Sequence, residues 1–224
     1  MSNFFNPENG FFTFMGKVFD MLVLNLLWLV LCIPIVTIVP ATTALYYAVV
    51  KVIRRERSYA LKEFWRSFRA NFRQGAAFSM MAVVAAVVLV IDFRYAWQLM
   101  LEQNTSGSLM LGIFLVIGLI LSGILVYLCP ILSRFEMKVS GHLKTAFFMS
   151  SRHLLTTLVL VLMWAVGLFG MYLIPVLTFV LPVLMVFASS FLLERIFKKY
   201  MPKKESGDGE DTEDSEKKDE WYLE

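Results

Sequence analysis

Few residues in this chain belong to the types that commonly carry out chemistry, and they stand far apart. The histidines are His142 and His153, and the cysteines are Cys32 and Cys129. Two cysteines without histidines at ligand spacing are too few for a zinc site, and they offer no disulfide framework. The sequence also contains no phosphate-binding glycine loop, His-Glu-x-x-His pair or Gly-x-Ser-x-Gly turn. We therefore predict that the protein is not an enzyme and has no catalytic residue, metal site, cofactor or nucleic-acid partner.

The remaining polar candidates lie within or beside apolar stretches. Asp92 directly follows one such stretch and Arg94 stands two residues later. An ionisable residue inside a membrane is a functional candidate by default, but a place at the outer boundary would hydrate this pair, and we favour that interpretation. A second set either lines a polar track or bonds to neighbouring helices and carbonyls, and we favour the bonding role. Its members are Asn25, Thr37, Thr42 and Thr43.

Membrane helices are the elements that must position these residues. The forty residues Leu154–Leu193 include no Asp, Glu, Lys, Arg or His. Because about 20 apolar residues cross the hydrocarbon core of a bilayer, this run predicts two membrane helices with a turn before Pro175. A hydrophobic fraction of 58% and 20 phenylalanines in 224 residues agree with a small polytopic membrane protein. The predicted fold class is an all-α bundle of membrane helices.

The apolar stretches predict five membrane spans, and the charges between them predict their orientation. Seventeen basic residues fall in three segments that an odd number of spans places on one side, with Lys17 and Arg94 on the other. Basic segments stay in the cytoplasm, so the N-terminus should lie outside and the C-terminus inside. The expected spans are Met21–Val39, Gly75–Ile91, Leu109–Leu128, Leu154–Met171 and Pro175–Leu193.

These spans divide most of the chain into two parts. Residues 1–20 are rich in phenylalanine and should form an extracytoplasmic segment in the membrane interface. Residues 21–200 should form the helix bundle, with basic cytoplasmic loops at 40–74 and 129–153. The first apolar stretch lacks a basic region before it and is followed by positive charge, so we expect an uncleaved helix rather than a signal peptide.

The residues after the bundle, 201–224, have a different character. Ten acidic residues fall within 205–224, and the acidic part has no aromatic side chain that could build a core. We predict a disordered cytoplasmic tail. Its last residues include Trp221 and Tyr222, which are either a docking motif for a partner or solvated without one.

Within the first basic loop, residues 58–74 predict an amphipathic helix that begins at the candidate N-cap Ser58. Apolar residues recur every three or four positions, and a basic strip runs beside them. Such a helix either lies on the anionic inner leaflet of the bilayer, where each basic residue contributes about 1 kcal/mol, or packs beneath the bundle. The two strips are Leu61, Phe64, Trp65, Phe68 and Phe72, and Lys62, Arg66, Arg69 and Arg73.

The first third of the chain also carries an ordered set of short motifs. They are Asn25 and Trp28, Pro-Ile-Val-Thr at 34–37, Ala-Leu-Tyr-Tyr at 44–47, Phe64-Trp65 and Asn71-Phe72. This order resembles the YesL family of bacterial membrane proteins. The resemblance implies a multi-pass protein of the cytoplasmic membrane that accompanies carbohydrate uptake systems of the ABC type and their sensor kinases. It implies no established biochemical activity.

Two hypotheses about function follow. The first is a non-catalytic accessory or regulatory membrane protein beside a carbohydrate transporter or sensor kinase, based on the resemblance and the lack of catalytic motifs. The second is a small transporter or permease subunit for a sugar or related solute, because prolines at 34, 130, 175 and 182 could break helices and expose backbone groups. Charges that could couple transport to ions are scarce within the spans, which favours the first hypothesis.

Overall fold

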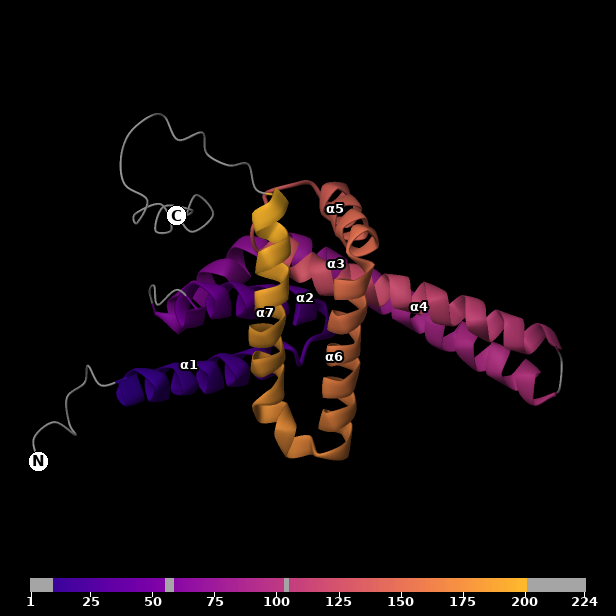
Figure 1. Cartoon of the computed structure of the whole chain (residues 1–224), viewed down its shortest axis with the longest axis horizontal. Helices are drawn as coiled ribbons and strands as arrows, with labels where there is room; N and C mark the ends of the chain where they lie inside the picture. Colours follow the sequence, from indigo (N-terminus) through magenta and orange to yellow (C-terminus); the bar gives the residue numbers. More distant parts are fainter. Residues whose placement is uncertain (1–9, 55–58, 103–104, 201–224) are drawn as a thin grey trace, which may run out of the picture.

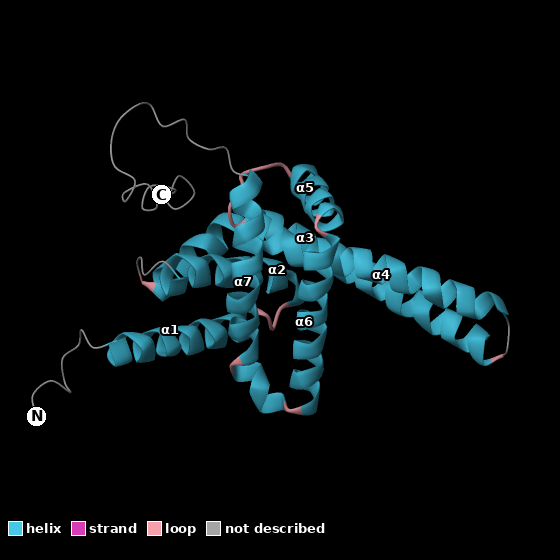
Figure 2. Ribbon diagram, viewed as in Figure 1, coloured by secondary structure: helices cyan, strands magenta, loops and turns pink. Residues whose placement is uncertain are grey.

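The computed structural model describes residues 10–54, 59–102 and 105–200, which form helices joined by short turns (Figure 2). No strand occurs among these residues, so the all-α prediction is confirmed. The predicted tail, 201–224, with Trp221 and Tyr222, and the first part of the interfacial segment, 1–9, lie outside the described residues. The α-helices are α1 (Gly10–Leu31), α2 (Ile38–Ala48), α3 (Ala60–Leu101), α4 (Thr105–Leu132), α5 (Val139–Arg152), α6 (Leu154–Leu173) and α7 (Leu181–Tyr200). The shorter segments are the 3-10 helices η2 (Ile35–Thr37) and η4 (Pro175–Phe179) and the π-helix η3 (Val49–Arg54).

Five segments within the described ranges are long and apolar enough to cross a membrane: Phe14–Leu31, Ile35–Arg54, Ala60–Leu101, Ser106–Leu132 and Leu154–Leu173. Their number matches the prediction, but one member differs. The expected span Pro175–Leu193 is divided between η4 and α7, because the chain forms a 3-10 turn at Pro175, and Ile35–Arg54 joins the set instead. The first expected span also ends early, since α1 stops at Leu31, ahead of Pro34.

The helices form apolar arms that meet at one packed centre (Figure 1). α3 and α4 pair as a long hairpin on one side of the centre, and α1 extends from the other side. α6 and α7 lie side by side and run across the direction of that hairpin. Many large apolar side chains on these arms are exposed, as expected of helices that contact lipid. The buried core lies where α2, η3 and the inner ends of α3, α4 and α7 meet.

The centre is built on the close approach of α2 to α3. A Cβ atom on Gly75 of α3 would lie 2.9 Å from the ring carbons of Pro40, so a glycine is required where these helices touch. The N–H of Val39, near the start of α2, donates to the hydroxyl of Ser79 at 3.0 Å. This contact satisfies one of the first N–H groups of α2, which have no partner inside the helix.

The two segments predicted as basic loops are mostly helical. Where the structure describes 40–74, it consists of α2, η3 and the first turns of α3, and most of α2 is buried. The second segment, 129–153, contains the end of α4 and all of α5, so the connection between these helices is limited to 133–138. The sequence predicted basic cytoplasmic segments here, with a helix in the first of them, and several of the basic residues are buried and paired, as described below.

The predicted amphipathic helix is the first part of α3, which continues without a break into the long hairpin. Its aromatic face is divided. Phe64 and Phe68 are buried in the core, whereas Trp65 and Phe72 are exposed along with the basic strip. The two buried phenylalanines therefore do not belong to a lipid-facing surface, because the centre of the protein covers that side of α3.

Asn25 of α1 ties this helix to the start of α7. Its side chain is fully buried. Nδ2 donates to the carbonyl of Thr178 at 3.0 Å, and Oδ1 accepts from the N–H of Val183 at 3.2 Å. In the hydrocarbon core of a bilayer no water is available to bond to backbone N–H and C=O groups. Where a helix is interrupted, the protein itself must provide hydrogen-bond partners for these groups. Asn25 does this at the break between η4 and α7.

We expect Asn25→Leu to lower the stability of the purified protein in detergent, because two backbone groups lose their partner. An unsatisfied buried group costs about 1–3 kcal/mol. Thermal unfolding followed by circular dichroism should show a lower midpoint. Ser122→Ala is the control, since the Ser122 hydroxyl donates within its own helix, to the carbonyl of Leu119. Equal losses in the two variants would contradict the role assigned to Asn25.

Candidate functional site

A buried ion pair joins the end of α4 to α7. Arg134 lies two residues beyond α4, and its guanidinium pairs with Glu194 of α7; the two side chains are 3% and 6% exposed. The hydroxyl of Tyr46 on α2 donates to the same carboxylate oxygen at 3.0 Å. The Arg134 guanidinium also lies over the ring of Phe197, 5.2 Å from its centroid. One carboxylate thus connects α2, α7 and the chain that follows α4.

A second buried pair holds η3 against α3. Lys51 Nζ lies 3.0 Å from Glu63 Oε2, and it donates to the hydroxyl of Tyr47 at 3.3 Å. One turn later, Arg54 donates to the carbonyl of Ser190 on α7 at 3.1 Å. These basic residues, which the sequence presents as a signal of membrane orientation, therefore also hold helices together.

Neither Glu63 nor Glu194 stands out among the candidates from the sequence, yet each carries a signal. Glu194 directly follows the charge-free run Leu154–Leu193, and Glu63 is one of two acidic residues in the basic segment 51–73. An acid in such a place indicates a paired charge, because an uncompensated buried charge is costly. The partner is what the sequence does not reveal, since Arg134 precedes Glu194 by 60 residues.

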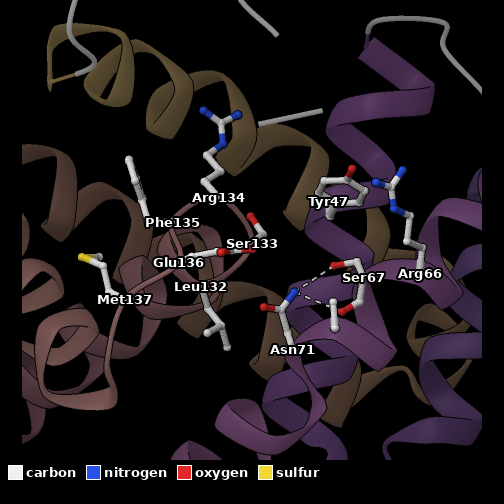
Figure 3. Close-up of a pocket in the computed structure, with 11 residues that line it drawn as sticks. Tyr47, Arg66, Ser67, Asn71, Leu132, Ser133, Arg134, Phe135, Glu136 and Met137 are labelled. Carbon is white, nitrogen blue, oxygen red and sulfur yellow. Dashed lines mark hydrogen bonds between the residues drawn. The ribbon is translucent and has the colours of Figure 1, made fainter. Parts of the chain in front are cut away.

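A polar pocket of about 560 Å³ opens beside these ion pairs (Figure 3). Its volume falls in the range of small-molecule sites, about 300–1,000 Å³. The connection that forms one wall is held against α3, because Gln74 Nε2 donates to the carbonyl of Met137 at 3.1 Å. The walls come from α2, α3 and the α4–α5 connection, with Tyr47, Arg66, Ser67, Ala70, Asn71 and residues 132–137. This pocket is the candidate functional site.

Hydrogen bonds within the walls determine which polar atoms are available to a ligand. Asn71 Nδ2 donates to the carbonyl of Ser67 at 3.0 Å and to its hydroxyl at 3.3 Å, so Asn71 Oδ1 is directed away from Ser67 (Figure 3). The hydroxyl of Ser133 donates to a carbonyl of α4 at 2.7 Å, which leaves its oxygen as an acceptor. The hydroxyl of Tyr47 accepts from Lys51 and keeps its own proton for donation.

The polar-track candidates lie at separate packing contacts. Asn25 bonds to the start of α7, and Thr42 joins α1 to α2 because its hydroxyl accepts from Trp28 Nε1 at 3.1 Å. The hydroxyl of Thr43 donates to the carbonyl of Val39 at 2.8 Å. Thr37 donates to the carbonyl of Pro34 at 2.6 Å. Asn25 and Thr42 thus bond between elements, whereas Thr37 and Thr43 bond to carbonyls of their own turns.

The remaining candidates lie away from the pocket. Asp92 is half-buried in the C-terminal half of α3. Arg94 is exposed and lines a surface hollow together with Trp97. Within 10–54, 59–102 and 105–200, no group of three or more His, Cys, Asp and Glu side chains is placed to hold a metal ion.

The two histidines, His142 and His153, each form a contact between helices. His142 is buried, with Nε2 3.1 Å from Gln74 Oε1 and its ring edge-on to Phe78. Burial lowers the pKa of His142 below its usual 6.5, and the backbone of Met137 opposes this shift only in part. His142 is therefore neutral near pH 7. The Nε2 of His153 lies 3.0 Å from the hydroxyl of Tyr200 and holds the start of α6 near the end of α7.

Long apolar helices around a centre of paired charges define this chain as a polytopic helical membrane protein. Residues 21–93 match the family model described as "Protein of unknown function, DUF624". The chain is 28% identical to "Uncharacterized protein YesL" of Bacillus subtilis over 200 residues, 85% of this chain and 87% of that protein. It is 26% identical to "Uncharacterized protein YteU" of the same organism over 190 residues, 83% of this chain and 82% of that protein. No solved structure matches the chain.

These matches confirm the resemblance to the YesL family, because the chain is similar to YesL and YteU over most of its length. The family match covers α2, η3 and most of α3 together with the second half of α1. It therefore includes Asn25, the pair Lys51–Glu63 and the α2 and α3 walls of the pocket. The pocket wall at 132–137 and Glu194 lie beyond that match.

We expect Glu194→Ala to destabilise the protein strongly, because Arg134 would stay buried without this carboxylate. Removing one partner of a buried ion pair costs about 3–5 kcal/mol. The double variant Arg134→Met/Glu194→Leu removes both charges and should recover much of the lost stability. Unfolding midpoints in detergent measure both effects, with Lys198→Ala on the exposed side of α7 as the control. A double variant as unstable as Glu194→Ala would show that the uncompensated charge is not the cause.

Proposed function

We propose that this YesL-like protein is a non-catalytic accessory or regulatory protein of a bacterial cytoplasmic membrane, and that it works beside a carbohydrate uptake system. Its partner is an ABC-type transporter or the sensor kinase of such a system, as the family resemblance implies. The observation that carries the proposal is the placement of charge. Buried acids and bases are paired across helices at the centre, and a polar pocket opens beside them. This arrangement suits a scaffold that presents a site to a partner or ligand without converting it.

Transport by the isolated chain is the alternative function. Transporters place substrate sites at membrane depth, commonly beside broken helices with exposed backbone groups. Here the break between η4 and α7 has backbone groups bonded to Asn25. A cavity of about 320 Å³ lies between α3 and α4. Its walls are mostly apolar, and Ser122 contributes a hydroxyl group to them. Both features support helix packing more than the passage of a sugar.

The proposal keeps the predicted orientation, with the N-terminus outside and the C-terminus in the cytoplasm. This orientation requires that α7 crosses the bilayer and that Ile35–Arg54, which is mostly buried within the protein, does not. Basic segments that are distant in the sequence come together near the centre: Arg152 of α5 lies over the ring of Tyr200 at the end of α7, 5.5 Å from its centroid. The end of α3 and the start of α4 lie at the far end of the long hairpin (Figure 1). The preference of basic segments for the cytoplasm supports placing the centre inside and this end of the hairpin outside.

Cysteine labelling of intact cells tests the orientation. In a variant with Cys32 and Cys129 replaced by serine, Ser106→Cys at the α3–α4 turn should react with a membrane-impermeant maleimide. Lys144→Cys on α5 is exposed in the structure and should react only after lysis. Labelling of Lys144→Cys in intact cells, with Ser106→Cys protected, would reverse the orientation.

Recovery of partners tests the proposed function itself. The full chain, purified from its own host in mild detergent, should bring with it a subunit of an ABC-type transporter or a sensor kinase, identified by mass spectrometry. The same chain reconstituted alone into liposomes should show no saturable uptake of a sugar. Recovery of neither partner would reject the accessory role, and saturable uptake by the isolated chain would establish the transporter.

A further inference from the structure

We propose that the polar pocket beside Arg134 binds a small, neutral, polyhydroxylated ligand of the class of mono- and disaccharides. The inference deepens the proposed function and rests on it for its biological role, because a bound sugar would make the accessory protein responsive to a solute. The pocket walls support such binding because they combine hydrogen-bonding groups of both kinds, charged residues of both signs and apolar surfaces.

Hydrogen-bond donors and acceptors both occur among the residues that line the pocket. The acceptors are Asn71 Oδ1, the hydroxyl oxygen of Ser133 and the carboxylate of Glu136. The donors are the hydroxyl of Tyr47 and the guanidinium of Arg66. A hydroxyl group donates one hydrogen bond and accepts up to two, so a ligand with several adjacent hydroxyls can use both kinds of wall group.

Charged residues of both signs line the pocket. Arg134 is paired with Glu194, and its guanidinium turns from the pocket toward α7 (Figure 3). Arg66 contributes one positive charge and Glu136 one negative charge. An anionic ligand would meet the Glu136 carboxylate and Asn71 Oδ1, whereas a cationic ligand would meet Arg66. Since the walls compensate neither kind of charge well, a neutral ligand loses least on leaving water.

Apolar groups also line the pocket. Leu132, Phe135, Met137 and the ring of Tyr47 provide surfaces on which the C–H faces of a sugar ring can pack. Sites for small molecules commonly combine such surfaces with a few placed polar groups. A fully apolar ligand would fit worse, because it would leave the polar atoms of the walls without partners.

Isothermal titration calorimetry with the full chain in detergent tests this inference. The neutral probes are glucose, xylose and maltose, and the anionic probe is glucose 6-phosphate. We expect saturable binding of at least one neutral sugar, weaker binding of the phosphate, and a loss of about tenfold in affinity in Asn71→Ala and in Arg66→Gln, since one hydrogen bond contributes about 1.4 kcal/mol. Arg69→Gln is the matched control, because Arg69 is exposed on the same helix but does not line the pocket.

Each other outcome overturns the inference. Absence of saturable binding by every neutral probe rejects a sugar site, and tighter binding of glucose 6-phosphate rejects a neutral ligand. Unchanged affinity in both pocket variants, or an equal loss in Arg69→Gln, places the sugar outside this pocket. Unfolding midpoints close to that of the parent protein show that the variants are folded. If a transporter subunit is recovered from the host while no sugar binds, the proposed function stands and this inference falls.

Discussion

The centre of this protein depends on one constraint, which is that a charge buried among apolar helices needs an opposite charge in contact with it. Glu194 places a carboxylate on the buried side of α7, directly after a long run of residues without charge. Arg134 reaches it from the end of α4, and Tyr46 adds a hydrogen bond from α2. Once these contacts form, the course of the α4–α5 connection is set, and that connection provides one wall of the polar pocket.

The same constraint divides the basic residues into groups with different roles. Lys51, Arg54 and Arg134 reach groups on other helices or helical segments and stabilise their packing. Lys62, Arg69 and Arg73 are exposed along α3, where they can contact water or anionic lipid. Arg66 lies on the same helix but lines the pocket. The number of basic residues in a segment therefore indicates its side of the membrane, whereas their individual partners determine what each of them does.

Much of the helical architecture can be predicted from the sequence, because long apolar runs have few other stable forms in a bilayer. The turn near Pro175 also follows from the residues, since proline removes a backbone donor. Periodicity identifies an apolar face at Phe64 and Phe68, but it does not reveal whether lipid or α2 covers that face. The pocket is harder still to predict, because its walls join Tyr47 and Asn71 to a connection more than sixty residues later. Contacts between residues so distant in the sequence depend on tertiary packing, which a local sequence pattern does not reveal.

The length of α3 has a mechanical consequence. Its 42 residues form one helix of about 63 Å, roughly twice the thickness of a hydrocarbon core. The outer half belongs to the long apolar hairpin, and the inner half carries Arg66, Ser67 and Asn71. Arg66 lies nine residues, or about 14 Å, from Gly75, where α2 presses on the helix. If α3 rotated about its contact at Gly75, a change of about 10° in helix tilt would move Arg66 by about 2 Å. A tilt of α3 about its contact with α2 would therefore also displace the α3 wall of the pocket.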